Sequence, residues 1–280
     1  SIAIGYTSDT STVPSIAGVS VDKGKSLTYK IKIAGANGKT IRIGSSMGLV
    51  NSNLTLPNGA SALDVFTMAS KVSDVLLAGV GDNGTIDTTD SEQTFITGTD
   101  PNNYIWYSGK LWRAVSIDPS DNSVKLVTQW NISAFPYNAE NNTAFQGSYM
   151  EQWLNDTSVD GFLGNLRDPG KFIKTDSVWN ATLTTTTTKP KKTTMVTDAV
   201  GLLNAYEYTM SYKNATYSTG YLNNGLYWWT LTPDSTSYLR DVNSWGYVNT
   251  FSPTTSYGSR PSVNLKSAVK IIDGDGTIDN

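Results

Sequence analysis

The residues best suited to binding chemistry lie near the C-terminal end of the chain, where tryptophan, tyrosine and arginine alternate with turn residues. Their rings could stack on a sugar or a partner protein, and the guanidinium groups could bind an anion. The candidate ligand-binding residues are Trp228, Trp229, Tyr238, Arg240, Trp245, Tyr247, Tyr257 and Arg260. The competing interpretation, which we favour for the cluster as a whole, is that the rings fill a core and the arginines bridge loop carbonyl groups.

Trp228 and Trp229 are adjacent, so their side chains point to opposite faces if this segment is extended. We therefore expect one ring in the core and the other partly exposed. The loops Asp234 to Ser237 and Asn249 to Ser256 would then be held up by the rings and form the contact surface.

A second candidate site is the acidic segment at the end of the sequence. Asp273, Asp275 and Asp279 alternate with glycines, which resembles the first half of a calcium loop. The bidentate Glu that completes such a loop does not follow in this sequence. Turn formation by Asp and Gly explains the pattern without a metal. We expect no cofactor, with calcium as the alternative.

Catalysis has little support in this composition. The chain contains no cysteine and no histidine, which excludes a thiolate zinc site, a cysteine nucleophile and a Ser-His-Asp triad. Acid pairs such as Asp234 with Asp241, or Glu140 with Glu151, exist, but their spacing does not identify them as glycosidase carboxylates. We expect a protein that is not an enzyme.

Charge and polarity point to the outside of a cell. The net charge is −3 and the only basic run is Lys189 to Lys192, so nucleic acid and anionic membranes are poor partners. No run reaches the roughly 20 apolar residues of a membrane span. A surface rich in Thr, Ser and Asn and a start at Ser1 are typical of a processed extracellular protein. Triplets that would allow glycosylation begin at Asn53, Asn83, Asn131, Asn141, Asn155, Asn180 and Asn214.

The elements that would position these residues form two units, 1–100 and 101–280. At the start of the first unit, Ile2, Ile4 and Tyr6 alternate as in a strand. This strand could pair within its own domain, or it could act as an assembly strand on the open sheet edge of a neighbouring copy.

The rest of the first unit is predicted to be a small, β-rich α+β unit. An Asn-Gly turn between alternating apolar residues predicts a hairpin over 27–43. A capping box at Ser61 predicts a helix over 61–78, and a short strand is expected over 94–97.

The second unit is predicted to begin with three strands, over 104–107, 111–117 and 124–128. Helices are expected from Ser148 and over roughly 198–208. The Thr-Lys-Pro tract over 182–192 is of low complexity and is expected to form a protruding loop.

Several segments of residues 101–280 resemble an uncharacterised extracellular domain common in Firmicutes. The segments that carry the resemblance are Trp106 to Arg113, Ser148 to Asn155, Val200 to Tyr208, Tyr227 to Pro233, Arg240 to Val248 and Gly258 to Val263. This signature is similar to the C-type-lectin-like fold of formylglycine-generating enzymes and of retroelement variable proteins. The resemblance implies a C-type-lectin-like domain with two helices and a twisted antiparallel sheet, and a surface or secreted location. The enzyme branch of that group depends on cysteine, so its activity does not carry over.

Two functions remain open after this comparison. The first is a secreted bacterial cell-surface structural protein, a subunit of an extracellular filament or layer that assembles with other copies of itself by strand donation. The second is a glycan- or protein-binding adhesin module that uses the aromatic-supported loops. The uncharged, threonine-rich composition and the lack of reactive side chains favour the first.

Overall fold

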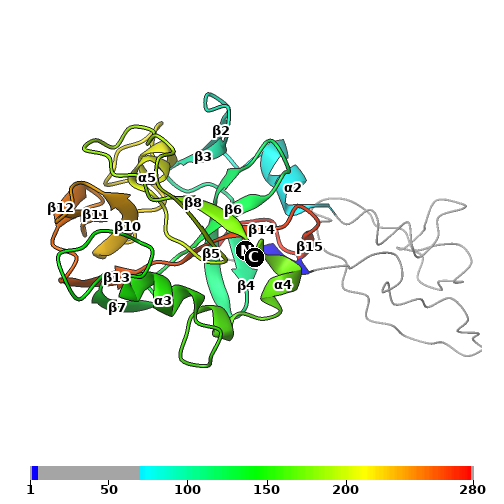
Figure 1. Ribbon diagram of the computed structural model, residues 1–280. Helices are drawn as coiled ribbons and strands as arrows, with labels where there is room; N and C mark the ends of the chain where they lie inside the picture. The colour runs from blue at the N-terminus through cyan, green and yellow to red at the C-terminus, as the bar shows by residue number, and fades with distance from the viewer. Residues whose placement is uncertain (1, 6–69, 279–280) are drawn as a thin grey trace, which may run out of the picture.

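The computed structural model describes residues 2–5 and 70–278, in which two β-sheets pack around one core (Figure 1). The larger sheet contains β1 (Ile2–Gly5), β2 (Gly84–Asp87), β3 (Thr94–Gly98), β4 (Tyr104–Tyr107), β5 (Lys110–Ile117), β6 (Val124–Thr128), β14 (Ser262–Leu265) and β15 (Lys270–Asp273). Its order is β14-β6-β5-β4-β1-β15, and the β2–β3 hairpin joins it because β3 pairs with β5.

The smaller sheet lies at the left of Figure 1 and has the order β12-β11-β10-β13-β7. Its strands are β7 (Ser133–Pro136), β10 (Trp228–Pro233), β11 (Leu239–Val242), β12 (Val248–Phe251) and β13 (Ser256–Ser259), and a separate hairpin is formed by β8 (Ser177–Asn180) and β9 (Met195–Asp198). The short helices are α2 (Val72–Ala78), α3 (Tyr149–Asn155), the 3-10 turn η2 (Leu163–Asn165), α4 (Pro169–Phe172) and α5 (Ala205–Ser211).

The fold class is α+β, with few helices and mostly antiparallel pairing, as predicted. The three strands predicted between residues 104 and 128 are confirmed as β4, β5 and β6. The helix predicted from Ser148 is confirmed as α3, and the Ser148 side chain accepts a hydrogen bond from the Glu151 amide. None of the helices in the described part of the chain combines the length and the apolar character needed to cross a bilayer.

The first strand of the chain pairs with the chain's own sheet. β1 lies between β4, to which it is parallel, and β15, to which it is antiparallel. Ile2 is paired with Ile105, and Ile4 is paired with Ile271. Tyr6, the hairpin predicted over 27–43 and the first part of the helix predicted over 61–78 lie outside the described residues, whereas Val72–Ala78 is helical as α2.

Strands on both sides of the expected boundary near residue 101 belong to the same sheet. β2 and β3 precede that position, yet Thr94 of β3 pairs with Ile117 of β5 and Phe95 pairs with Ser116. The backbone of Asn102 also donates to the carbonyl of Val80 at 2.7 Å. Residues 80–98 are therefore structural neighbours of the segment that follows them.

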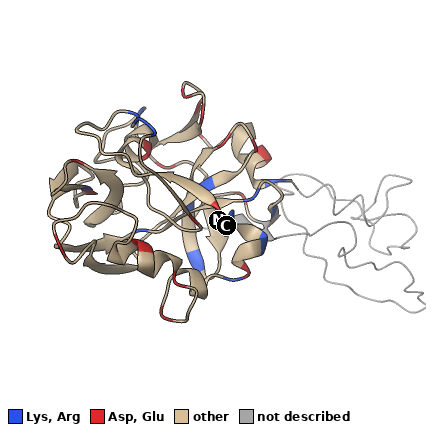
Figure 2. Cartoon of the chain, in the orientation of Figure 1, with Lys and Arg blue, Asp and Glu red and all other residues tan. Residues whose placement is uncertain are grey.

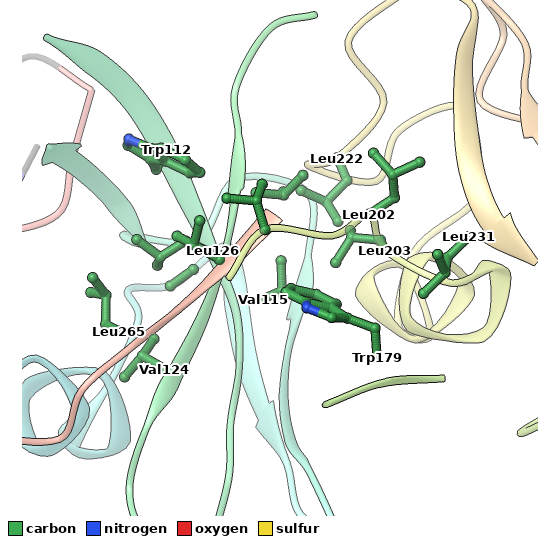
Figure 3. Packing of buried hydrophobic residues seen from close by; sticks show 14 of the residues in the cluster. Trp112, Val115, Val124, Leu126, Trp179, Leu202, Leu203, Leu222, Leu231 and Leu265 are labelled. Atoms are coloured by element: carbon green, nitrogen blue, oxygen red, sulfur yellow. The ribbon is translucent and has the colours of Figure 1, made fainter. Parts of the chain in front are cut away.

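The core lies between the two sheets, and the segment 199–204 runs through it (Figure 3). Leu202 and Leu203 from this segment belong to the same buried cluster as Trp179 of β8 and Leu231 of β10. Gly201 exchanges backbone hydrogen bonds of 3.0 and 2.9 Å with Ser262. A Cβ atom at position 201 would lie 2.3 Å from the Trp179 ring, so only glycine fits this crossing without a shift of its neighbours.

This crossing corrects the helix predicted over 198–208. Residues 199–204 are buried and not helical, and α5 begins only at Ala205. Asn204 and Glu207 form a capping box, in which the Asn204 side chain accepts from the Glu207 amide and the Glu207 carboxylate accepts from the Asn204 amide. The apolar residues before Asn204 face the core from a non-helical segment.

The tract over 182–192 is a loop, as predicted, but ion pairs and a backbone hydrogen bond tie it to the rest of the domain. Lys189 makes ion pairs with Asp90 at 2.8 Å and with Glu92 at 3.1 Å, and Lys192 pairs with Glu92 at 2.7 Å. At the other end of the tract, the Thr184 amide donates to the carbonyl of Pro233. The tract therefore packs onto the domain, where Lys189 and Lys192 pair with the acidic residues between β2 and β3.

Candidate binding surface

Trp228 and Trp229 are both fully buried, which corrects the expectation that one of them would be partly exposed. Trp228 packs edge-on against Tyr208 of α5, with ring centroids 5.2 Å apart. Trp229 faces the other side of β10, where its ring lies 6.0 Å from Tyr137 and 4.9 Å from Tyr257. Both faces of β10 are covered, so neither indole is free to contact a ligand.

The two arginines hold the fold together, as the favoured interpretation predicts. Arg260 is fully buried and donates to the carbonyls of Thr128 at 2.8 Å, Gln129 at 3.2 Å and Leu222 at 2.5 Å. Burial lowers the pKa of Arg260 to about 9, so the guanidinium is still charged at neutral pH.

Arg240 is almost fully buried and has a similar structural role. Its Nε donates to the carbonyl of Thr184 at 3.1 Å, and Nη2 contacts the carboxylate of Asp234. Its guanidinium is therefore engaged by the turn before β11 and by the Thr-Lys-Pro tract.

Three further aromatic residues form a partly exposed row over Trp229, which we call the aromatic row: Tyr227, Tyr257 and Phe251. The ring centroids of Tyr227 and Tyr257 are 5.0 Å apart, and those of Tyr257 and Phe251 are 5.5 Å apart. Tyr227 is 44% exposed and Phe251 42% exposed, whereas Tyr257 is half-buried between them. A buried indole under contiguous half-exposed rings gives a firm apolar platform at the surface.

The backbone beneath the aromatic row is tightly constrained. The Gly258 amide and the Asn131 side chain both donate to the carbonyl of Tyr227, each at 3.0 Å. A Cβ atom at Gly258 would lie 1.9 Å from the Asn131 amide nitrogen. Tyr227 and Tyr257 are therefore held side by side by the junction of β10, β13 and the segment before β7.

The turn between β11 and β12 presents a second aromatic group, with Trp245 76% exposed at its tip. The Asn243 carboxamide oxygen accepts from the amides of Trp245 and Tyr247, each at 3.0 Å. The Tyr208 hydroxyl donates to the carbonyl of Gly246 at 2.7 Å, which ties the turn to α5. The exposed Tyr247 packs edge-on against Tyr217, with centroids 5.7 Å apart. Trp245 is thus displayed on a fixed turn.

Tyr238 is the last of the predicted ligand-binding residues, and it lies apart from these contacts. Its ring is 52% exposed on the turn before β11, and its carbonyl accepts from the amides of Asp234 and Ser235. The predicted cluster therefore divides into buried residues (Trp228, Trp229, Arg240 and Arg260) and partly or fully exposed ones (Tyr238, Trp245, Tyr247 and Tyr257). Tyr227 and Phe251 join Tyr257 in the structure, although the sequence-based list of site residues lacks them.

The segments that carry these rings have few charged side chains (Figure 2). Between residues 214 and 259 the ionisable acids and bases other than tyrosine are Asp234, Arg240 and Asp241. Asp234 and Arg240 pair with one another. The exposed polar groups are therefore amides and hydroxyls, such as those of Asn249 and Thr254.

Asp241 is a fully buried acid on the strand next to Trp229, with which it is paired in the sheet. Neither of its carboxylate oxygens has a hydrogen-bond partner among the described residues. Burial raises the pKa of Asp241 to about 7, and burial followed by the nearby Asp241 raises the pKa of Tyr257. The carboxyl is consequently neutral over much of the acidic pH range.

The predicted calcium residues cannot be assembled into a site from the described part of the chain. Asp279 lies outside the described residues, as does the side chain of Asp273. The Asp275 carboxylate accepts from the Thr277 amide at 3.0 Å and from the Thr277 hydroxyl at 2.7 Å, which is turn chemistry. No group of three or more metal-ligating side chains occurs within residues 2–5 and 70–278. Calcium binding stays a prediction.

A polar cavity of about 340 Å³ lies elsewhere, between the β8–β9 hairpin, β6 and the Lys189–Lys192 segment. Trp179 and Lys125 line it, and the Lys125 ammonium lies 5.0 Å from the Trp179 ring and 2.5 Å from the Glu207 carboxylate. None of the predicted site residues lines this cavity. Its residues are scattered between positions 92 and 264, so no local sequence pattern marks it.

Comparisons with known proteins give no relative for this chain: no family model, no curated protein and no solved structure matches it.

Proposed function

We propose that this chain is an extracellular glycan-binding module and that the aromatic row is its ligand surface. The observation that carries the proposal is the contiguity of Tyr227, Tyr257 and Phe251 over the buried Trp229, with no acidic or basic residue in the segment 242–259. A neutral sugar offers an apolar ring face that can stack on such rings, and hydroxyls that can bond to neighbouring amides. The resemblance to the C-type-lectin-like fold is part of the same proposal.

The polar side chains around the aromatic row favour a neutral ligand over a charged one. An acidic glycan or a phosphate would call for exposed arginine or lysine. The arginines of this region, Arg240 and Arg260, are buried against carbonyls and Asp234. Exposed amides and hydroxyls instead favour a hydroxyl-rich ligand, with Asn249 and Thr254 on the same stretch of chain as Phe251.

The turn that carries Trp245 could extend the ligand-binding surface beyond the aromatic row. Exposed tryptophan and tyrosine on a constrained backbone lose little conformational entropy on binding. Trp245 and Tyr247 could therefore add contacts to a longer glycan chain. A protein partner at the same turn is the second candidate, because a 76% exposed tryptophan on a fixed turn is typical of an interface anchor.

A glycan array probed with the full chain tests the proposal. We expect binding to neutral glycans that is lost in Tyr257→Ala and weakened at least tenfold in Tyr227→Ala. Trp106→Ala is the matched control, because Trp106 is 48% exposed but lies on β4 of the other sheet. Equal losses in the control variant, or no neutral glycan bound by the wild-type chain, would contradict the proposal. Binding that needs Trp245 but not Tyr257 would favour the protein-partner alternative.

A further inference from the structure

In the eight-stranded sheet, β1 lies between β4 and β15, and its removal would leave a strand-wide gap between them. β1 contributes four residues and is hydrogen-bonded on both sides, to β4 through Ile2 and Ala3 and to β15 through Ala3, Ile4 and Gly5. β15 is the last strand in the sheet order, so β1 is what joins it to the other strands. If β1 leaves, β4 and β15 both expose an unpaired edge, and such edges recruit another strand.

Both sides of this gap are held in place by residues other than β1. β4 is paired along its whole length with β5, from Tyr104 opposite Arg113 to Tyr107 opposite Lys110. β15 is tied to the start of α2, where the amide of Ile271 donates to the carbonyl of Ser70 at 3.0 Å.

A direct bond also links the two sides of the gap. The Tyr104 amide donates to the carbonyl of Gly276 at 3.0 Å, just after β15. The two edges that receive β1 are therefore also joined by contacts that do not involve it.

Backbone pairing does not distinguish the chain's own β1 from that of another copy, because both present the same sequence to the same two edges. The connection between β1 and residue 70 consists of residues 6–69. A chain of that length spans at most about 230 Å when fully extended, so the covalent connection permits β1 to reach the sheet of a neighbour.

We propose that β1 is an exchangeable strand and that the gap between β4 and β15 is its acceptor, so that one copy of this chain joins a second copy by strand exchange. The partner is another copy of the same chain. Exchange in one direction would extend into a linear assembly, and reciprocal exchange would close a dimer. This interface involves the larger sheet and is independent of the aromatic row on the smaller one.

The absence of cysteine from the sequence allows a direct test in the full chain. Ala3 is paired with Trp106, and partners in neighbouring strands lie within disulfide reach. Chains carrying Ala3→Cys are mixed under oxidising conditions with differently tagged chains carrying Trp106→Cys. We expect a disulfide-linked heterodimer of the two tags in excess of random oxidation, because β1 of one copy in the gap of the other places the two cysteines opposite one another.

The control replaces Trp106→Cys with Thr186→Cys, an exposed position outside the sheet. Heterodimer formation no greater than in this control overturns the proposal.

A second measurement does not depend on the cysteine variants. Size-exclusion chromatography of the wild-type chain over a dilution series should show multimers that Ala3→Pro abolishes, because proline removes an N–H group from a strand that is bonded on both sides. Ala3→Val keeps the N–H group and favours a strand, so it should retain the multimers. Multimers that persist in Ala3→Pro, or a wild-type chain that is monomeric throughout, overturn the proposal.

Discussion

The guanidinium of Arg260 lies 4.9 Å from the ring of Trp228, and it donates to three carbonyls, those of the adjacent residues Thr128 and Gln129 and that of Leu222. A planar, charged group with several donors suits this position, because it can donate to all three carbonyls at once. The pair therefore couples β10 of the smaller sheet to the end of β6 in the larger one.

Replacing this arginine is expected to weaken the whole fold. Arg260→Lys keeps the charge but cannot reach three carbonyls, so we expect a loss of about 3 kcal/mol in the free energy of unfolding. Arg240→Lys is the matched comparison and should cost about 1 kcal/mol, since Arg240 donates to one carbonyl and its ion-pair partner Asp234 is partly exposed. Urea denaturation measures both changes. Equal losses would show that the hydrogen bonds of Arg260 contribute no more to stability than those of Arg240.

The buried Asp241 predicts a stability that depends on pH. An unfolded aspartate loses its proton near pH 4, whereas the folded chain retains it to about pH 7. Between these values the unfolded state binds fewer protons, so the free energy of unfolding should fall as pH rises from about 4 to about 7, by on the order of a few kcal/mol. The contribution is fully present below pH 4 and is lost once Asp241 ionises.

The measurement is urea denaturation of the wild type and of Asp241→Asn at a series of pH values. The variant cannot ionise at this position, so its advantage over the wild type should grow with pH. Asp198, whose pKa burial and Glu151 raise to about 6, acts in the same direction in both proteins and cancels in the difference. Parallel curves for the two proteins would show that Asp241 does not titrate in this range.

The two layers of the aromatic surface should respond differently to truncation. Trp229→Ala removes a fully buried indole and should cost about 3–5 kcal/mol. Tyr227→Ala removes a ring that is 44% exposed and should cost below about 1 kcal/mol. Thermal and urea unfolding give both values. A cost for Tyr227→Ala as large as that for Trp229→Ala would assign the aromatic row to the core.

Gly201 provides a test of the crossing through the core. Gly201→Ala places a methyl group 2.3 Å from the Trp179 ring and should destabilise the protein by about 1–3 kcal/mol. Gly170→Ala is the control, because a Cβ atom there meets nothing within 4 Å, and it should be neutral or slightly stabilising. The melting temperatures of the two variants make the comparison. Similar shifts for both would mean that Trp179 moves aside at little cost.

Local patterns predicted the elements that local chemistry determines. The strands β4, β5 and β6 follow from alternating residues between turn signals, and α3 follows from its Ser148 cap. The start of α5 was missed although the Asn204 and Glu207 pair marks it in the sequence. The buried residues before Asn204 have a pattern that suits either a helix or a non-helical core segment, and the pairing of Gly201 with Ser262 decides in favour of the second.

The candidate surface depended more on tertiary contacts. The sequence indicated aromatic density around Trp228 and Tyr257, but it could not show that Tyr137 and Tyr208 cover the two faces of β10. The burial of Asp241 was equally inaccessible, because it results from packing between strands and not from its neighbours in the chain. The Thr-Lys-Pro tract is held against the domain by Asp90 and Glu92, which lie about a hundred positions earlier in the sequence.

Ala3 pairs with Asp273, which is 270 positions later in the chain (273 − 3). This pairing can therefore form only late in synthesis. A ribosome that adds roughly 5–20 residues per second needs on the order of 10–50 s to make the second strand after the first. Throughout that interval β1 has emerged while one of its two partners does not yet exist. Chains made close together on one messenger would present free first strands to finished neighbours during this interval.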